Sequence, residues 1–199
     1  MGNDVAPATT DGRSLRRARS YEAVVEAILD LLVEGTVQPT AKAVAERSGV
    51  SLRTVFRLFD DVESLNAAAI ARQAERVAPL LVDPPTDGPR ESRIAGLVAH
   101  RAAYYEAIAG TRRHALRLAS SSPTIAKGLA QSRRFLRRQV ERVFATELEE
   151  AGDAAGEMLL ALAVASSWET WDVLRTGHDL TRPSAVQVMA RLVRGALDH

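Results

Sequence analysis

The residues best suited to bind another molecule lie in the segment SLRTVFRL, positions 51–58. Leu52, Arg53, Thr54 and Arg57 occupy the outward positions of a short predicted helix. Arginine and threonine are hydrogen-bond donors, and an arginine can bind a guanine edge through two hydrogen bonds. A helix with such donors on its outer side suits the major groove of double-stranded DNA, so this segment predicts a DNA-reading helix.

The segment before it supplies what is needed to position such a helix. Ala45 is small enough to let a second helix cross closely, Gly49 tolerates the positive φ of a tight turn, and Val55 offers an apolar contact back to the first helix. Thr40 and Ser51 are placed to cap the two helices at their N-termini. Residues 40–60 therefore predict a helix–turn–helix.

The end of this segment resembles a known family. Phe56, Arg57, Phe59 and Leu65 follow the order found in the TetR family of repressors, where the recognition helix ends and a long helix begins. The resemblance is at the level of motifs over residues 21–66 and only architectural beyond them. The family usually has tyrosine where this chain has Phe56. A tyrosine hydroxyl can donate a hydrogen bond to a DNA phosphate, whereas phenylalanine cannot.

The resemblance implies a fold and a mechanism. It implies an all-α protein of about nine helices, with an N-terminal three-helix helix–turn–helix head joined to a helical-bundle body for ligand binding and dimerisation. Two heads of a homodimer would bind a palindromic operator in double-stranded DNA. A small-molecule effector in the body would release them, so the protein would be a transcriptional regulator, and a repressor.

A cluster of arginines precedes the predicted head. Arg13, Arg16, Arg17 and Arg19 fall within seven residues. They either contact phosphates or form a solvated charged stretch, and the nearby helix–turn–helix favours contact. The predicted DNA-binding residues are Arg16, Arg17, Thr40, Ser51, Leu52, Arg53, Thr54, Phe56 and Arg57.

The sequence predicts three parts of the chain, and the segments outside the helix–turn–helix are also expected to be mainly helical. The polar stretch 1–12 is expected to be disordered. The predicted domains are a flexible basic arm at 1–20, the DNA-binding domain at 21–66, and the ligand-binding and dimerisation domain at 67–199. The expected helices span 21–34, 61–78, 90–109, 112–119, 122–151, 153–175 and 181–197, besides the two of the helix–turn–helix.

The predicted helix at 153–175 is apolar on two sides. One face carries Leu159 and Leu162 with Val173, and another carries Leu160 and Val164 with Trp168 and Trp171. A helix that is apolar on two sides is buried on two sides. We expect one face to meet its own core and the other a second subunit, together with the helix at 181–197; the alternative is a central helix of a monomer.

Five residues of the predicted body are candidates to line a ligand cavity. Aromatic and histidine side chains are also common in plain cores, so this alternative stays open. His100 and Tyr104 stand four apart and share a helix face. The candidates are His100, Tyr104, Tyr105, Trp168 and Trp171.

Composition excludes several classes of protein. The 199 residues are 46% hydrophobic and 26% charged, as in ordinary globular proteins, and the net charge of +1 gives no general argument for nucleic acid. There is no cysteine, hence no disulfide or cysteine zinc site. No apolar run approaches the roughly 18 residues of a membrane span, and the N-terminus lacks the apolar core of a signal peptide. We expect a cytoplasmic protein without a membrane partner.

Nothing in the sequence asks for catalysis. The four histidines are scattered, with no two at helical spacing for a metal ion. No serine–histidine–aspartate order, glycine-rich phosphate loop or paired carboxylate motif stands out. We therefore expect no enzymatic activity, no metal and no cofactor. Two alternatives remain: a helical ligand-binding or enzymatic protein whose helix–turn–helix is only a packing unit, and a DNA-binding adaptor whose body binds a protein.

Overall fold

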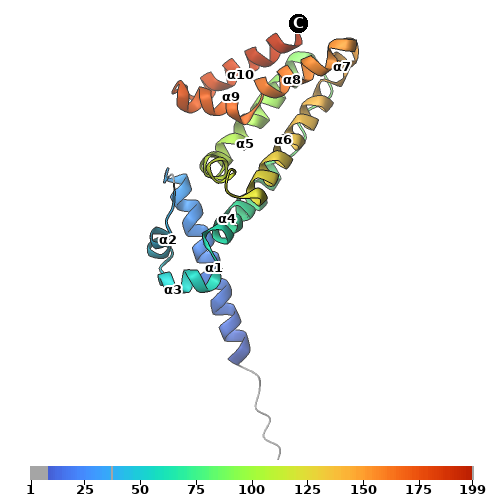
Figure 1. Cartoon of the computed structure of the whole chain (residues 1–199). Helices are drawn as coiled ribbons and strands as arrows, with labels where there is room; N and C mark the ends of the chain where they lie inside the picture. Colours follow the sequence, from blue (N-terminus) through green and yellow to red (C-terminus); the bar gives the residue numbers. More distant parts are fainter. Residues whose placement is uncertain (1–8, 37, 199) are drawn as a thin grey trace, which may run out of the picture. The chain divides into compact units, whose positions relative to one another are not determined.

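The computed structural model describes residues 9–36 and 38–198 of the chain. Every regular element in these ranges is helical, which confirms the expected all-α class (Figure 1). The chain divides into two compact units, each made of two segments. The first unit consists of the described residues up to Glu75 together with Gly110–Ile125, and the second consists of Arg76–Ala109 together with the described residues from Ala126 onward. Within the described ranges, no helix is both long and apolar enough to cross a lipid bilayer.

The first unit is built on three N-terminal helices, α1 (Thr9–Val33), α2 (Ala41–Ser48) and α3 (Leu52–Leu58). The start of α4 (Val62–Val77) and the end of α5 (Arg90–Leu118) belong to the same unit. Apolar side chains of α1 to α4 form one core, because each helix turns one apolar stripe inward. Its members include Val24, Val25, Ile28, Leu32, Val44, Ala45, Val55, Phe59, Leu65 and Ala69.

The turn between α2 and α3 has the expected geometry. Thr40 accepts a hydrogen bond from the Ala43 amide at 3.1 Å, and Ser51 accepts one from the Thr54 amide at 3.2 Å, so both predicted N-caps are confirmed. Gly49 ends α2 with a φ of 70°, in the left-handed region that glycine adopts without strain. Local sequence therefore defines this helix–turn–helix.

Helix α1 begins earlier than expected. It starts at Thr9, so residues 9–20 of the predicted flexible arm are helical, while residues 1–8 lie outside the described residues. The segment from Leu15 to Arg19 consists of residues with high helix propensity and no breaker, which favours the helical conformation of this part of the extension. The arginines of the N-terminal cluster consequently have fixed helical spacing.

Helix α4 is capped by Asp61 at its N-terminus. Asp60 and Glu63 form a capping-box pattern in the sequence, but the Asp61 carboxylate accepts the Ser64 amide at 2.7 Å instead. Glu63 is used elsewhere, since it accepts a hydrogen bond from the Ser122 hydroxyl at 2.6 Å. A contact distant in sequence thus displaced the local pairing.

Two expected helices, 90–109 and 112–119, form the continuous α5. Gly110 does not stop the helix, because it is a point of close approach: a Cβ on Gly110 would lie 2.9 Å from the carbonyl carbon of Leu32 in α1. Glycine is tolerated inside a helix at a cost of about 1 kcal/mol. Here it allows α5 to touch the backbone of α1.

The second unit contains the remaining helices around a separate apolar core. The expected helix at 122–151 is broken at Phe144, where the backbone leaves helical geometry (φ −117°, ψ 30°). Besides the end of α4 and the first part of α5, the elements of the second unit are η1 (Ala78–Leu80), α6 (Pro123–Val143), α7 (Ala145–Glu150), η2 (Gly152–Ala154), α8 (Ala155–Ala165), α9 (Trp168–Asp172), η3 (Val173–Gly177) and α10 (Arg182–Leu197).

The expected helix at 153–175 is also divided. Ser167 adopts an extended conformation (ψ 164°) and caps α9 by accepting the Thr170 amide at 3.1 Å. This break rotates the residues that follow relative to α8. Trp168 and Trp171 therefore point into the core, whereas Leu160 and Val164 stay exposed, which corrects the prediction that these four share one face.

Candidate nucleic-acid interface

Helix α3 has an inner and an outer side. Val55 is buried against the core, whereas Leu52 and Phe56 are 42% and 52% exposed. Arg53 and Arg57 are exposed as well. Because the turn at Gly49 and the cap at Ser51 fix the start of α3, this outer side is held in one orientation. The outer side of α3 thus combines the exposed donors Arg53 and Arg57 with exposed apolar groups.

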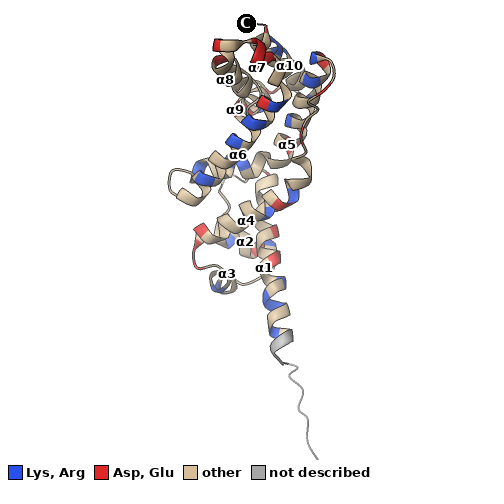
Figure 2. Ribbon diagram, turned by 90° about the vertical axis from the view of Figure 1, so that its right-hand side faces the viewer, with Lys and Arg blue, Asp and Glu red and all other residues tan. Residues whose placement is uncertain are grey.

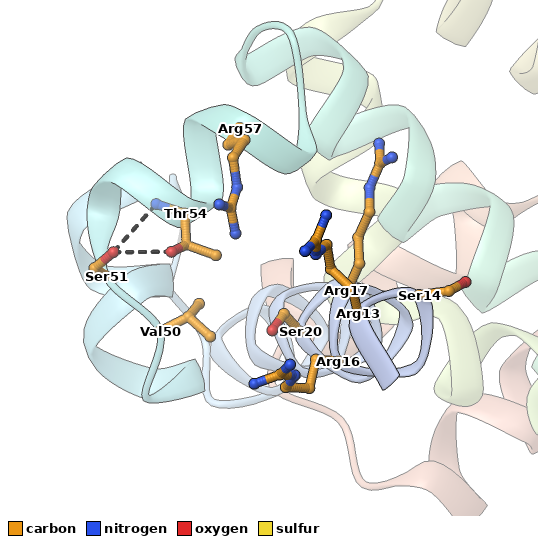
Figure 3. A pocket seen from close by; sticks show the side chains of 9 residues that line it. All are labelled: Arg13, Ser14, Arg16, Arg17, Ser20, Val50, Ser51, Thr54 and Arg57. Carbon is orange, nitrogen blue, oxygen red and sulfur yellow. Dashed lines mark hydrogen bonds between the residues drawn. The ribbon is translucent and has the colours of Figure 1, made fainter. Parts of the chain in front are cut away.

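A groove of about 860 Å³ separates α3 from the N-terminal part of α1 (Figure 3). Arg57 extends from α3 toward α1, and Arg17 lies across the space from it. Small polar side chains complete the walls. The residues lining the groove are Arg13, Ser14, Arg16, Arg17, Ser20, Val50, Ser51, Thr54 and Arg57.

The groove is strongly basic. Among the described residues that line it, four are arginines and none is acidic. Figure 2 shows the blue of the basic residues along the start of α1 and on α3. Several cations that face one space repel one another and attract an anion. The backbone of a nucleic acid carries a row of negatively charged phosphates, so it is an anion that could bind several of these arginines at once.

The hydroxyl groups of Thr40 and Ser51 cap the helices that follow them. Ser51 bonds the Thr54 hydroxyl at 2.9 Å in addition to capping α3. Thr40 is exposed and uses its oxygen as the cap of α2. Its hydroxyl hydrogen is not consumed by the cap, so Thr40 can still donate to a phosphate oxygen.

Contacts on the inner side hold α1 against the helix–turn–helix and α4. The rings of Tyr21 and Phe59 stack with centroids 4.9 Å apart. Arg72 of α4 pairs with Glu22 and, at 3.4 Å, with Glu26 of α1. These contacts fix the position of the α1 arginines relative to α3.

A further ion pair joins the end of α1 to α2. Arg47 donates to Glu34 at 2.7 Å. The hydrogen bond from Arg47 lowers the pKa of Glu34 below its ordinary value. Glu34 therefore stays ionised at neutral pH.

The structure brings together only part of the predicted DNA-binding set. Arg16, Arg17, Ser51, Thr54 and Arg57 line the groove. Thr40, Leu52, Arg53 and Phe56 are exposed on the same unit but outside the groove lining.

Sequence reasoning placed Arg13 in the basic cluster but left it out of the predicted DNA-binding set, and it missed three other lining residues: Ser14, Ser20 and Val50. Arg13 stands three and four residues before Arg16 and Arg17, so helical spacing would have grouped them had the helix been extended to this point.

Four of the five predicted ligand-binding residues lie in the core of the second unit: Tyr104, Tyr105, Trp168 and Trp171. The Tyr105 ring packs against Tyr104 at 5.7 Å and edge-on against Trp168 at 5.8 Å between centroids. Trp171 donates to the Glu106 carboxylate at 3.1 Å. These are the contacts of a packed core, and the prediction that the residues line a pocket stays a prediction.

His100 is the most accessible of the five, with intermediate exposure. Burial lowers the pKa of His100, and the neighbouring Arg101 charge lowers it further. The imidazole is therefore neutral at neutral pH and can accept as well as donate a hydrogen bond. Its Nδ1 atom lies 3.3 Å from Nη1 of Arg101.

Comparison with known proteins shows a similarity in fold. No family model matches the chain, and no curated protein matches it significantly. The crystal structure of a transcriptional regulator from Rhodococcus sp. Rha1 is similar, with a TM-score of 0.67 and 16% identical residues over 89% of this chain and 96% of that chain. At this low identity the likeness establishes that the two chains share a fold.

Proposed function

We propose that this protein is a DNA-binding transcriptional regulator of the TetR type, a repressor that acts in the cytoplasm. The observation that carries the proposal is the arginine-lined groove beside the exposed outer side of α3. Arginines along one wall suit phosphates, and an exposed recognition helix suits base edges. The likeness in fold to a solved transcriptional regulator supports the same role.

The exposure of α3 argues against a helix–turn–helix that serves only as a packing unit. A packing unit has no need for an uncovered outer side, yet Phe56 is 52% exposed. Large exposed apolar groups beside arginines are what contact with thymine methyl groups and sugar edges requires. This role involves no catalysis and no cofactor.

We further propose that the protein acts as a homodimer through α8 and α10. Leu160 and Val164 of α8 are 60% and 57% exposed, and Val173 and Leu192 are exposed as well. A second copy that covers these apolar side chains would give the assembly two recognition helices. Two heads must meet successive major grooves about 34–36 Å apart, so the proposed target is a palindromic operator.

The proposed effector is a small, largely apolar molecule bound in the second unit, near Tyr104 and Tyr105. Helix α4 begins in the first unit and ends in the second, so it is the proposed link between effector and DNA. An effector that favours one separation of the two heads shifts the population away from the DNA-binding state. A change of a few ångströms in that separation weakens operator binding.

Selection of bound fragments from random double-stranded DNA tests the proposal. We expect a palindrome with half-sites about one helical turn apart. Recovery of fragments without any common sequence, or of none, would contradict a sequence-specific regulator.

A charge-matched pair of variants tests the groove on the selected site. Replacing Arg13, Arg16 and Arg17 by glutamine should weaken binding and reduce the slope of log K against log salt by up to about 0.9 per lost phosphate contact. The control replaces three exposed arginines of α6 in the same way and should leave the slope unchanged. Equal effects of both variants would show that only net charge matters. The control residues are Arg134, Arg137 and Arg138.

A further inference from the structure

A buried arginine lies in the second unit between α5 and α6. Arg101 is 0% exposed. Its Nη1 donates to the Gln139 side-chain oxygen at 2.7 Å, and its Nη2 donates to the Leu136 carbonyl at 2.8 Å. Both acceptors are neutral, so the guanidinium is buried without an opposite charge among the described residues.

This arrangement is costly for the protein alone. A guanidinium does not lose its proton in proteins, even though burial lowers the pKa of Arg101. A buried charge without a counter-ion is strongly unfavourable, and an apolar side chain of similar size would usually be more stable there. The cost indicates that the charge has a use other than packing.

The acidic group that Gln139 contacts is bound to other partners. The Asp83 carboxylate accepts a hydrogen bond from the amide nitrogen of Gln139 at 3.2 Å and forms an ion pair with Arg142 at the surface. These bonds lower the pKa of Asp83, that from Gln139 most, so it stays ionised where it is. Asp83 thus orients Gln139 without neutralising Arg101.

Donors are left over on one edge of the guanidinium. The Nε–H of Arg101 is buried and has no hydrogen-bond partner among the described residues. Nη2 uses one of its two hydrogens on Leu136. Nε and Nη2 together form the fork that binds the two oxygens of a carboxylate in parallel.

Tyr104 and Tyr105 stand three and four residues after Arg101 on α5, so they share its face of the helix. The hydroxyl groups of Tyr104 and Tyr105 lie near enough to influence the Arg101 charge. Tyr105 donates its hydroxyl hydrogen to the Ser166 carbonyl at 2.9 Å. Tyr104 is buried, and no hydrogen bond from its hydroxyl is found within the described residues. The Tyr104 hydroxyl is therefore one further donor near Arg101, and the rings of the two tyrosines are apolar groups on the same helix face.

We propose that the second unit binds a small organic carboxylate whose anionic group pairs with Arg101 and whose apolar part lies against Tyr104 and Tyr105. The proposal specifies the chemical class of the effector, and it rests on the proposed function only for the link to DNA. His100 borders the same site through its contact with Arg101. A bound carboxylate neutralises the buried charge of Arg101, so a carboxylate should bind here more tightly than an uncharged molecule of the same shape.

Two matched pairs of probes test the chemistry on the wild-type protein. Octanoate and phenylacetate are titrated by calorimetry beside octanamide and phenylacetamide, which have nearly the same shape without the charge. We expect at least one carboxylate to bind about ten- to a hundredfold more tightly than its amide, as for hydrogen bonds to a charged group. Amides that bind as tightly as the acids, or the absence of binding by both acids, would overturn the proposal.

A variant of the arginine separates a ligand role from a structural one. Arg101→Met should lose the preference for the carboxylate and should melt at a temperature equal to or above that of wild type, because an uncompensated buried charge is gone. Arg138→Met removes an exposed charge from α6 and should change neither property. A destabilised Arg101→Met that still prefers the carboxylate would assign Arg101 a purely structural role.

A milder variant decides the matter if Arg101→Met does not fold. Tyr104→Phe keeps the ring and removes only the free hydroxyl, and we expect carboxylate binding to weaken about two- to tenfold. Unchanged binding would overturn the placement of the ligand. Because all these titrations are made without DNA, their failure is distinguishable from a failure of DNA binding, which the operator selection reports.

Discussion

At the scale of single residues, the two arginines of α3 differ in their surroundings. Arg57 faces the basic groove with the arginines of α1, whereas Arg53 is exposed outside it. A cation among others that face one space suits a phosphate, and an isolated arginine on the outer side suits a guanine edge. This difference supports distinct roles for two chemically identical side chains.

We predict different effects on DNA binding for the alanine variants of Arg53 and Arg57. Arg53→Ala should relax sequence preference at one operator position, where a bidentate pair contributes about 1–3 kcal/mol of discrimination. Arg57→Ala should weaken all sequences alike and reduce the slope of log K against log salt by roughly 0.9. Fluorescence anisotropy on matched and mismatched operators at several salt concentrations measures both, and interchange of the two outcomes would contradict the assignment.

A second residue-scale feature is the ion pair of Arg93 and Glu147 in the second unit. Arg93 donates to the Glu147 carboxylate at 2.9 Å and to the Val143 carbonyl at 2.6 Å, and both charged side chains are largely buried. Arg93 also lies over the Phe144 ring at 5.7 Å. The hydrogen bond from Arg93 holds the pKa of Glu147 below its ordinary value of 4.5.

This lowered pKa predicts a loss of stability in acid. A carboxylate with a lower pKa in the folded state contributes stability above its unfolded pKa and loses it as the pH falls through the folded pKa. Glu147→Gln should lower the free energy of unfolding by about 2 kcal/mol at neutral pH and flatten its decline below about pH 4.5. Urea unfolding between neutral pH and pH 3 tests this; an unchanged pH dependence would show that other carboxylates dominate.

At the scale of elements, the crossing of α5 and α1 depends on one glycine. Gly110 has no room for a side chain because the Leu32 backbone lies against it. By contrast, Gly128 in α6 has open space at the position of a Cβ. Packing therefore requires a glycine at position 110, whereas at position 128 a larger residue would fit.

We predict opposite stability changes for the two alanine variants at these glycines. Gly110→Ala should destabilise the protein by about 1–3 kcal/mol, because overpacking against backbone outweighs the gain in helix propensity. Gly128→Ala should stabilise it by up to about 1 kcal/mol. Thermal unfolding monitored by circular dichroism measures both, and a Gly110→Ala variant as stable as wild type would mean that α1 and α5 separate at little cost.

At the scale of the whole molecule, the exposed apolar side chains of α8 and α10 bear on assembly. Leu160 and Val164 stand four residues apart, so they form one stripe along α8. Both lie outside the core that buries Leu159 and Leu162 of the same helix. A second copy of the chain is the proposed cover for this stripe.

A lysine in this stripe should separate the subunits. We expect wild-type protein to sediment at about twice the chain mass, since an obligate interface buries on the order of 2,000 Å² or more. Val164→Lys should shift the protein toward the monomer and weaken operator binding. Val33→Lys, at an apolar residue that is 82% exposed on α1, should leave the dimer intact. A monomeric wild-type protein would refute the dimer.

Sequence alone determined the features that depend on neighbours within one helical turn. Thr40 and Ser51 cap helices, and Gly49 turns the chain, because each needs only backbone groups a few residues away. The inward side of α3 follows from the same short-range periodicity. The all-α class could be predicted for this reason.

Only the tertiary structure decided features that join distant segments. Local pattern presents Gly110 as a helix stop, but contact with Leu32 makes it part of a continuous helix. The break at Ser167 turned Trp168 and Trp171 inward, and Arg101 gave no sign in the sequence of being buried. Spacing places a residue on a face of its own helix, but which neighbour covers that face depends on packing between segments far apart in the chain.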